Sequence, residues 1–250
     1  MAIRVPRLSY EDVRGYADRF LGEHHPSLAA PVPIEEIVEF GLRINIIPIP
    51  GLQAVHDIDG FLSADMGAIS VDQYVFENRP ARYRFTLAHE IAHLVIHGDR
   101  LKEVAPKSIP DWKQFVRELP ERDYAWLEWQ AYAFGGLVLA PRSLLLAAHD
   151  EAVQAARDAG IDPAANLDFA RDYIASWIAR RFEVSSAVID KRLVCDGVWP
   201  RWDDRSCGGW FSGTLKGGSQ GWEVDRSVTG DFRTTAGSAR SHRSKHCVGH

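Results

Sequence analysis

Hydrophobic residues change period within the first third of the chain. Over residues 10–21 they recur at helical spacing, which predicts an amphipathic helix that ends near His24-His25-Pro26. A second helix is predicted over residues 34–40, closing at Gly41. Short β-branched runs bounded by proline and glycine follow at residues 42–49, 51–56, 60–64 and 68–72. These runs predict a small, mainly antiparallel sheet.

Helical spacing returns after the predicted strands. It predicts a helix over residues 79–97 that stops at Gly98, and another over 123–139 that stops before Pro141, where a further helix can begin. The interval 99–122 contains several prolines and is expected at the surface. A helical pair is predicted at 166–182 and 185–193. Helices, then strands, then helices indicate an α+β fold, with the sheet packed on the 79–97 helix.

The chain is long enough for one main domain with appended segments. Its 250 residues, 46% of them hydrophobic, can bury a sizeable core. We assign residues 1–30 to an N-terminal helical segment and residues 31–197 to the main domain. Residues 198–250 are rich in glycine and serine and lack a sustained period, so we expect a disordered tail.

Charge and cysteine usage narrow the classes of partner and compartment. A formal net charge of -5 argues against a broad nucleic-acid surface, so direct nucleic-acid binding is not expected. The start of the chain lacks the apolar core of a secretory signal, and the apolar run 131–140 is far shorter than the ~20 residues that span a bilayer. Three widely spaced cysteines fit no disulfide framework. We therefore expect a cytoplasmic protein with no membrane partner.

The strongest chemical signal is the segment His89-Glu90-Ile91-Ala92-His93, an HExxH sequence within the predicted 79–97 helix. Residues four apart lie on one face of a helix, so the two imidazoles can bind one zinc ion. Glu90 can then reach a metal-bound water and act as the catalytic base. The alternative is a pair of histidines and a solvated glutamate without metal. Apolar residues on both sides, which place the segment mid-helix, favour the zinc site.

A catalytic zinc site needs a third protein ligand, and Glu128 is the best candidate. Ala131 and Gly135 continue its helix face, and such small residues let two helices approach closely. His97 continues the histidine series, but it lies another ~6 Å along the axis, so we expect it to contact a ligand or the helix end rather than the metal. Alternatives near the start of the second helix are Glu118, Glu121 and Asp123.

These residues predict peptide-bond hydrolysis with one zinc ion per chain. A hydrogen-bond donor must also stabilise the tetrahedral oxyanion, and the sequence does not choose between several candidates. They are Tyr132, Tyr83, Tyr124 and His149. The strand at 68–72 could present an edge to which an extended substrate adds by main-chain hydrogen bonds.

Three ordered blocks together resemble the ImmA/IrrE family of zinc metallopeptidases. They are residues 84–93 (RFTLAHEIAH), Glu128-x-x-Ala131-x-x-Phe134 followed by residues 139–141 (LAP), and residues 182–185 (FEVS). The resemblance covers residues 34–193. It implies that His89, His93 and Glu128 are zinc ligands and that Glu90 is the catalytic base. The chain departs from the family pattern at Tyr132, where asparagine is usual, and in the long interval between His93 and Glu128.

The resemblance also implies a substrate: a partner protein, a transcriptional repressor of the helix-turn-helix class, cleaved at a specific site. The competing interpretation uses the helical pair at 167–193 to bind DNA or a regulator without catalysis. The arginines Arg180 and Arg181 favour DNA binding. Glu183 at the tight turn and Asp190, which would face phosphates, argue against it.

Overall fold

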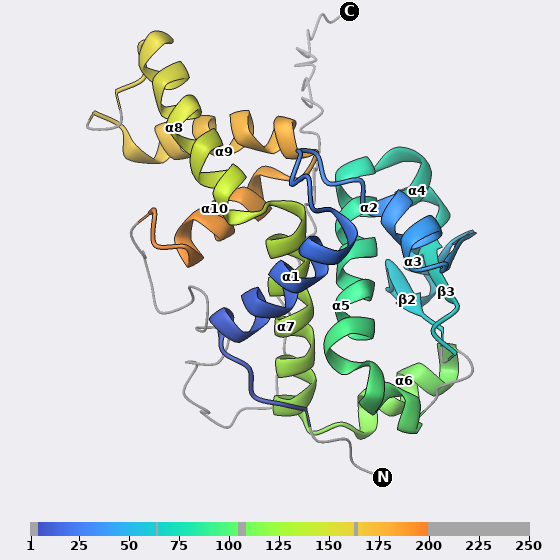
Figure 1. The fold of residues 1–250 in the computed structure, drawn as a ribbon. Coiled ribbons are helices and arrows are strands. Elements are labelled where there is room, and N and C mark those ends of the chain that lie inside the picture. Colours follow the sequence, from blue (N-terminus) through green and yellow to red (C-terminus); the bar gives the residue numbers. More distant parts are fainter. Residues whose placement is uncertain (1–4, 64, 105–108, 163–164, 200–250) are drawn as a thin grey trace, which may run out of the picture.

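The computed structural model describes residues 5–63, 65–104, 109–162 and 165–199, and it confirms the α+β fold (Figure 1). The elements are α1 (Tyr10–His24), α2 (Ile34–Glu36), the π-helical turn η1 (Ile37–Gly41), β1 (Asn45–Ile49), α3 (Leu52–His56), β2 (Gly60–Leu62), β3 (Ala68–Asp72), α4 (Gln73–Asn78), α5 (Pro80–Val104), α6 (Ile109–Glu118), α7 (Glu121–Leu139), α8 (Arg142–Asp158), α9 (Leu167–Phe182) and α10 (Ser186–Cys195). The expected tail lies, from residue 200 onward, outside the described residues.

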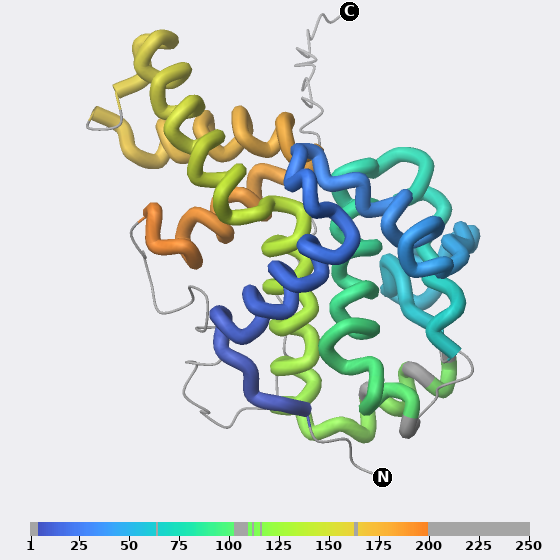
Figure 2. Tube along the Cα trace, in the orientation of Figure 1, coloured from blue at the N-terminus to red at the C-terminus, as the bar shows by residue number. Residues whose placement is uncertain are grey.

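The elements lie in layers around the long helix α5. In Figure 2, α1, α7, α5 and the sheet follow one another across the molecule, and α8 and α9 extend from the end of α7 away from the sheet. One apolar core joins these layers, because it includes Phe20 of α1, Ile91 of α5, Phe134 of α7 and Ile178 of α9. The N-terminal helix therefore packs into the same core as the HExxH helix.

The sheet is mixed, which corrects the prediction of a mainly antiparallel one. Its strand order is β1-β3-β2, with β1 parallel and β2 antiparallel to β3. Residues 51–56, predicted as a strand, form helix α3 instead. The reason lies at the start of α3. Gly51, which precedes the helix, has a left-handed backbone conformation (φ 69°). The backbone N–H of Gln53 donates to the buried Asp72 carboxylate, with an N–O distance of 2.9 Å. Those contacts turn the chain out of the sheet and bring it back with β2.

Helix α5 is longer than its sequence pattern predicts. The expected stop at Gly98 is wrong, because α5 continues to Val104. Its last turns bury Leu101 in a small second cluster with Met66, Phe115 and Leu119. This burial outweighs the ~1 kcal/mol that a glycine costs inside a helix. The interval 99–122 is thus partly helical and partly buried, through α6, rather than a wholly superficial insertion.

Helices α5 and α7 pack closely, and small residues on α7 permit it. A Cβ atom at Gly135 would lie 3.5 Å from the His89 amide nitrogen, so this face of α7 lies in direct contact distance of the α5 backbone. Ala131, one turn earlier, is fully buried. The predicted role of these two residues in bringing Glu128 toward the histidines agrees with this packing.

Two further findings concern the length of the helices and the cysteines. No helix in the described ranges is by itself long and apolar enough for a membrane span; α7 and α8 together reach the length and composition, but they are bent by 65° where they meet. Cys195, the last residue of α10, is disulfide-bonded, which the number and spacing of the cysteines did not predict.

Candidate metal centre

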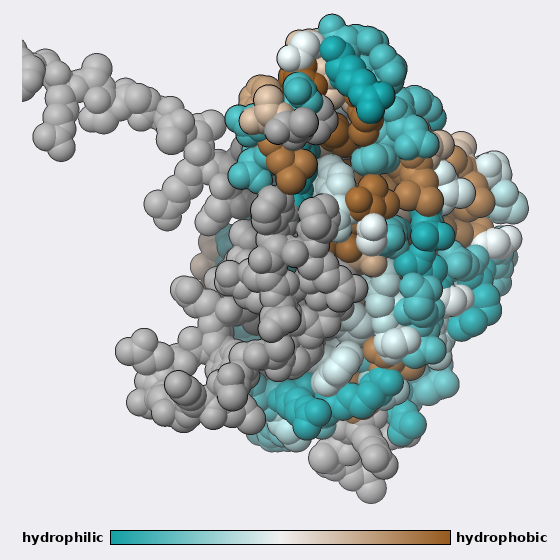
Figure 3. All heavy atoms as spheres, turned by 90° about the vertical axis from the view of Figure 1, so that its left-hand side faces the viewer, coloured by the Kyte–Doolittle hydropathy of each residue, from teal (hydrophilic) through white to brown (hydrophobic). Residues whose placement is uncertain are grey.

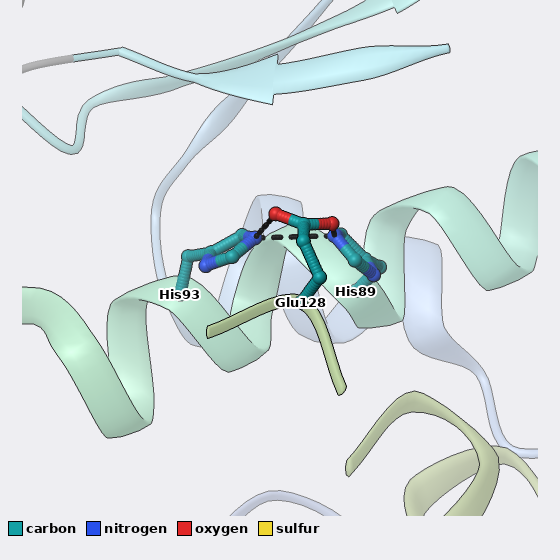
Figure 4. A group of neighbouring side chains, drawn as sticks. All are labelled: His89, His93 and Glu128. Atoms are coloured by element: carbon teal, nitrogen blue, oxygen red, sulfur yellow. Dashed lines mark hydrogen bonds and ion pairs between the residues drawn. The ribbon is translucent and has the colours of Figure 1, made fainter. Parts of the chain in front are cut away.

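Three side chains converge between α5 and α7 (Figure 4). The Nε2 atoms of His89 and His93 lie 3.1 Å apart. The carboxylate of Glu128 lies over both rings, with Oε2 3.4 Å from His89 Nε2 and Oε1 3.7 Å from His93 Nε2. The residues proposed from sequence as metal ligands are therefore brought together in space.

The spacing of these atoms fits one tetrahedral metal ion. With ligand bonds of 2.0 to 2.1 Å, neighbouring ligand atoms of a tetrahedral zinc site lie ~3.4 Å apart, close to the three distances given above. The donor set, two neutral imidazoles and one carboxylate, is a catalytic zinc set that leaves a fourth position for water. His89, His93 and Glu128 can therefore hold a metal ion.

Burial and the Glu128 carboxylate shift the pKa values of the two histidines in opposite directions. The pKa of His93 lies well below its usual value, because burial disfavours the charged ring and the neighbouring His89 and His97 oppose it. Burial also acts to lower the pKa of His89, but hydrogen bonding and attraction from Glu128 outweigh it, so the pKa is raised. A neutral His93 is ready to donate a lone pair to a metal.

Glu90 lines the same cavity as the three candidate ligands and reaches the sheet. Its side chain accepts a hydrogen bond from the backbone N–H of Leu62 on β2, with an N–O distance of 3.0 Å. The residue is 6% exposed, and burial raises the pKa of its carboxyl to about 7, against the attraction of His89. A carboxylate with a pKa near neutrality, next to the metal position, suits a general base.

A cavity of about 260 Å³ opens onto the three ligands. The segment from α3 to β2 and the helices α5 and α7 line it. Arg82 and Asp59 form its wall on one side, joined by two hydrogen bonds of 2.7 and 2.8 Å. Sequence reasoning missed both residues. The helical spacing of Arg82, Thr86, His89 and Glu90 on α5 could have identified the first, but nothing local marks Asp59 as its partner.

The structure separates the candidates for oxyanion stabilisation. Tyr132 and Tyr124 both line the cavity, and the Tyr132 ring lies 4.7 Å from the His89 ring. Burial, followed by the charge of Glu128, raises the pKa of Tyr132, so its hydroxyl stays protonated. Tyr83 packs against Phe76 instead. Neither Tyr83 nor His149 is among the residues that line this cavity.

His149 and His97 have different places. His149 lies on α8, with Nδ1 3.5 Å from its neighbour Asp150 and its ring 6.4 Å from that of Trp199. His97 lies on α5 beside the site, and its Nδ1 is 3.2 Å from His93 Nδ1. Burial lowers the pKa of His97 to about 4. His97 thus contacts His93; it is not one of the three side chains that converge on the metal position.

The edge of the sheet that faces the site is β2, which corrects the expectation for residues 68–72. Those residues form β3, the central strand, which pairs on both sides. The backbone groups of Asp59 and Ser63 form hydrogen bonds with β3. In an antiparallel pair such residues alternate with residues whose backbone groups face away from the partner strand. The N–H and C=O groups of Gly60 and Leu62 therefore face away from β3. β2 approaches α5 so closely that a Cβ at Gly60 would lie 2.6 Å from the Thr86 methyl group.

The C-terminal helical pair is built into the core. In α10, Val188, Ile189 and Leu193 are buried against the rest of the domain. Arg192 is buried too and donates to the Gly136 and Ala140 carbonyls at the end of α7. A DNA-recognition helix needs an exposed face that can contact the bases.

The surface of the molecule also bears on DNA binding. On the side shown in Figure 3, hydrophobic patches lie among the hydrophilic ones. The DNA-binding alternative gains no support.

Comparison with known families agrees with this geometry. Residues 76–194 match the Peptidase M78 family model, the IrrE N-terminal-like domain. Residues 76–194 form a domain of the ImmA/IrrE type. The matched residues include nearly all of α4 to α10, and so both helices that carry the candidate ligands. This domain supports a metallopeptidase-type function for the protein. No match was found among curated proteins.

Proposed function

We propose that the protein is a zinc-dependent endopeptidase that cleaves a partner protein at a specific site. The observation that carries this proposal is the convergence of His89, His93 and Glu128, with Glu90 held beside them against a sheet edge. The match of residues 76–194 to the Peptidase M78 family model supports metallopeptidase-type chemistry. The donor set favours zinc, because two imidazoles and a carboxylate with an open position form a catalytic zinc site.

Each residue has a role in hydrolysis. A bound zinc would lower the pKa of a water to ~7 and polarise the scissile carbonyl. Glu90 accepts the proton from the attacking water and passes it to the leaving amine. The hydroxyl of Tyr132, protonated at neutral pH, donates to the developing oxyanion. Glu128 would hold the metal together with His89 and His93.

The cavity suits an extended peptide. The outward backbone groups of Gly60 and Leu62 can pair with the main chain of a substrate, as an added strand pairs with a sheet edge. Main-chain pairing of this kind requires an unfolded or loop segment, because residues within a helix have their backbone groups occupied. The substrate therefore offers an exposed linker or loop.

For the substrate we propose a transcriptional repressor of the helix-turn-helix class. The support is the family resemblance, together with a cavity of about 260 Å³ that lies beside the edge strand β2. Cleavage in a linker of such a repressor would separate its domains and abolish repression. We propose a cytoplasmic site of action, where such a repressor works.

The test combines metal content with cleavage. Elemental analysis of the purified wild type should give about one zinc per chain, lost in His93→Ala. Incubation with candidate helix-turn-helix repressors, followed by mass spectrometry, should give one cleavage position that depends on zinc. Absence of zinc uptake on reconstitution would exclude the metal centre. Zinc binding without cleavage of any repressor would leave the metallopeptidase and remove the proposed substrate class.

A further inference from the structure

A continuous line of buried hydrogen bonds leads from the metal site to the N-terminal segment. His93 Nδ1 lies 3.2 Å from His97 Nδ1, and His97 Nε2 lies 3.0 Å from Gln130 Oε1. The Gln130 amide nitrogen then donates to the Pro6 carbonyl at 2.6 Å. His97 is 1% exposed and Gln130 is fully buried, so water cannot replace these partners.

The Pro6 carbonyl, at one end of this series of hydrogen bonds, determines which nitrogen of each histidine carries a proton. A carbonyl oxygen only accepts, so the nitrogen of the Gln130 amide must face Pro6 and its oxygen must face His97. That oxygen also only accepts, so His97 must carry a proton on Nε2. A neutral His97 then presents a lone pair on Nδ1, which can accept only from a protonated His93 Nδ1.

The metal site, at the other end of the series, independently requires a proton on His93 Nδ1. If His93 binds a metal through Nε2, the atom that faces His89 and Glu128, its proton must lie on Nδ1. That proton needs an acceptor, because buried donors are almost always paired. His97 Nδ1 is the acceptor that the geometry provides. The two ends of the line therefore agree on one set of protons.

We propose that His97 and Gln130 are positioning residues that hold His93 in the tautomer that binds the metal, with the Pro6 carbonyl as the fixed end of the line. The proposal rests on the metal centre proposed above. Groups that contact metal-binding histidines through their second nitrogen fix the ring orientation and increase affinity. Here the contact is itself a histidine, whose tautomer a glutamine and a backbone carbonyl determine.

The anchoring of Pro6 explains why the N-terminal segment lies along α7. Val5 is buried, and Arg7 forms an ion pair of 2.6 Å with Asp123 and lies over the Trp126 ring. These contacts on both sides hold the Pro6 carbonyl against Gln130 of the same helix. Residues 5–7 thus help to orient a metal ligand that is more than eighty positions away in the chain.

The test compares Gln130→Leu with Gln130→Glu. Leucine removes both the acceptor that faces His97 and the donor to the Pro6 carbonyl, whereas glutamate retains the acceptor and loses only the donor. The control is Gln154→Leu, because Gln154 is an exposed glutamine of α8 whose amide donates to Asp158. The zinc dissociation constant is measured by chelator competition, and circular dichroism checks that each variant is folded. Long-range 1H–15N spectra of the metal-free proteins report which nitrogen of each histidine carries the proton.

The expected result is that metal-free wild type has His93 protonated on Nδ1 and His97 on Nε2. Gln130→Leu should lose this preference and bind zinc about 10- to 100-fold more weakly, while Gln130→Glu stays closer to wild type and Gln154→Leu is unchanged. Unaltered tautomers and zinc affinity in folded Gln130→Leu would overturn the proposal. A wild type that takes up no zinc would refute the proposed function instead, and the tautomers of the metal-free protein would still decide this inference.

Discussion

The two walls of the cavity are built from different chemical groups. The helical wall, formed by α5 and α7, contributes side chains: two imidazoles and two carboxylates held by close helix packing. The wall formed by β2 and the segment before it contributes backbone groups, with the Leu62 N–H as its clearest member. The first wall supplies the reactive groups, and the second supplies an edge on which a peptide can be held.

This difference determines which wall each substitution can probe. Side-chain replacement removes a function directly on the helical wall. On the strand wall the functional groups belong to the main chain, so only a change in backbone position can disturb them. The following predictions use this contrast, beginning with the largest expected effect.

Replacement of Glu90 by glutamine should separate catalysis from metal binding. Glutamine keeps an oxygen that can accept from the Leu62 N–H but cannot take a proton from water. We expect kcat to fall by about 1,000-fold, within the range for loss of a general base, with zinc content unchanged. The measurements are the rate of substrate cleavage and elemental analysis. Retention of more than a tenth of the wild-type rate would exclude Glu90 as the base.

Replacement of Glu128 by alanine should weaken zinc binding by more than about 100-fold, beyond the usual cost of losing a residue that only supports a ligand. The reason is that its carboxylate is the third ligand of the set. Chelator competition measures the change. Glu121→Ala is the matched control, since Glu121 is an exposed glutamate at the start of the same helix. Equal losses in both variants would contradict the assignment.

Replacement of Tyr132 by phenylalanine should lower kcat by about 100-fold with little change in KM, as expected for one oxyanion donor. The ring keeps its stacking on Phe85, so the packing survives. Tyr124→Phe tests the other tyrosine of the cavity, and His149→Gln is the control from α8. A larger loss of kcat in Tyr124→Phe would move the donor to that side of the cavity.

Replacement of Gly60 by alanine should disturb the strand wall. The new Cβ would lie 2.9 Å from the Ser70 carbonyl oxygen as well as against Thr86, so β2 must shift away from α5. Overpacking of this kind costs about 1 to 3 kcal/mol. We expect a lower unfolding temperature and a KM raised about tenfold, with zinc binding retained.

The control for that variant is Gly67→Ala. The nearest atoms to a Cβ there belong to the Asp65 side chain, at an ordinary contact distance of 3.5 Å. Thermal unfolding and initial rates measured side by side would test the contrast. Equal behaviour of the two alanine variants would show that the position of β2 does not control substrate binding.

The helical wall could be predicted from sequence because its signals are local. The HExxH spacing is four residues along one helix, and Ala131 and Gly135 mark the face of α7 that approaches it. The pairing of the strands could not be predicted in the same way. Residues 51–56 have an apolar pattern that suits a strand, but the left-handed Gly51 and a hydrogen bond to the distant Asp72 carboxylate turn residues 52–56 into α3.

The predicted end of the helix at Gly98 is wrong for a related reason. A glycine ends a helix only when no tertiary contact favours the next turn. Here Leu101 meets Phe115 and Leu119, which lie beyond the proline-containing interval. Long-range partners decided both cases, and no window along the sequence contains them.

The hydrogen bond between Leu62 and Glu90 joins the two walls, and it has a consequence for the order of events. One backbone N–H cannot fully serve two acceptors. A peptide carbonyl that pairs with β2 at Leu62 has to take this N–H from the Glu90 carboxylate. Binding of the substrate and loss of the hydrogen bond between Leu62 and Glu90 then become a single step. The Glu90 carboxylate would become available as a base only when a peptide bond is present to be cleaved.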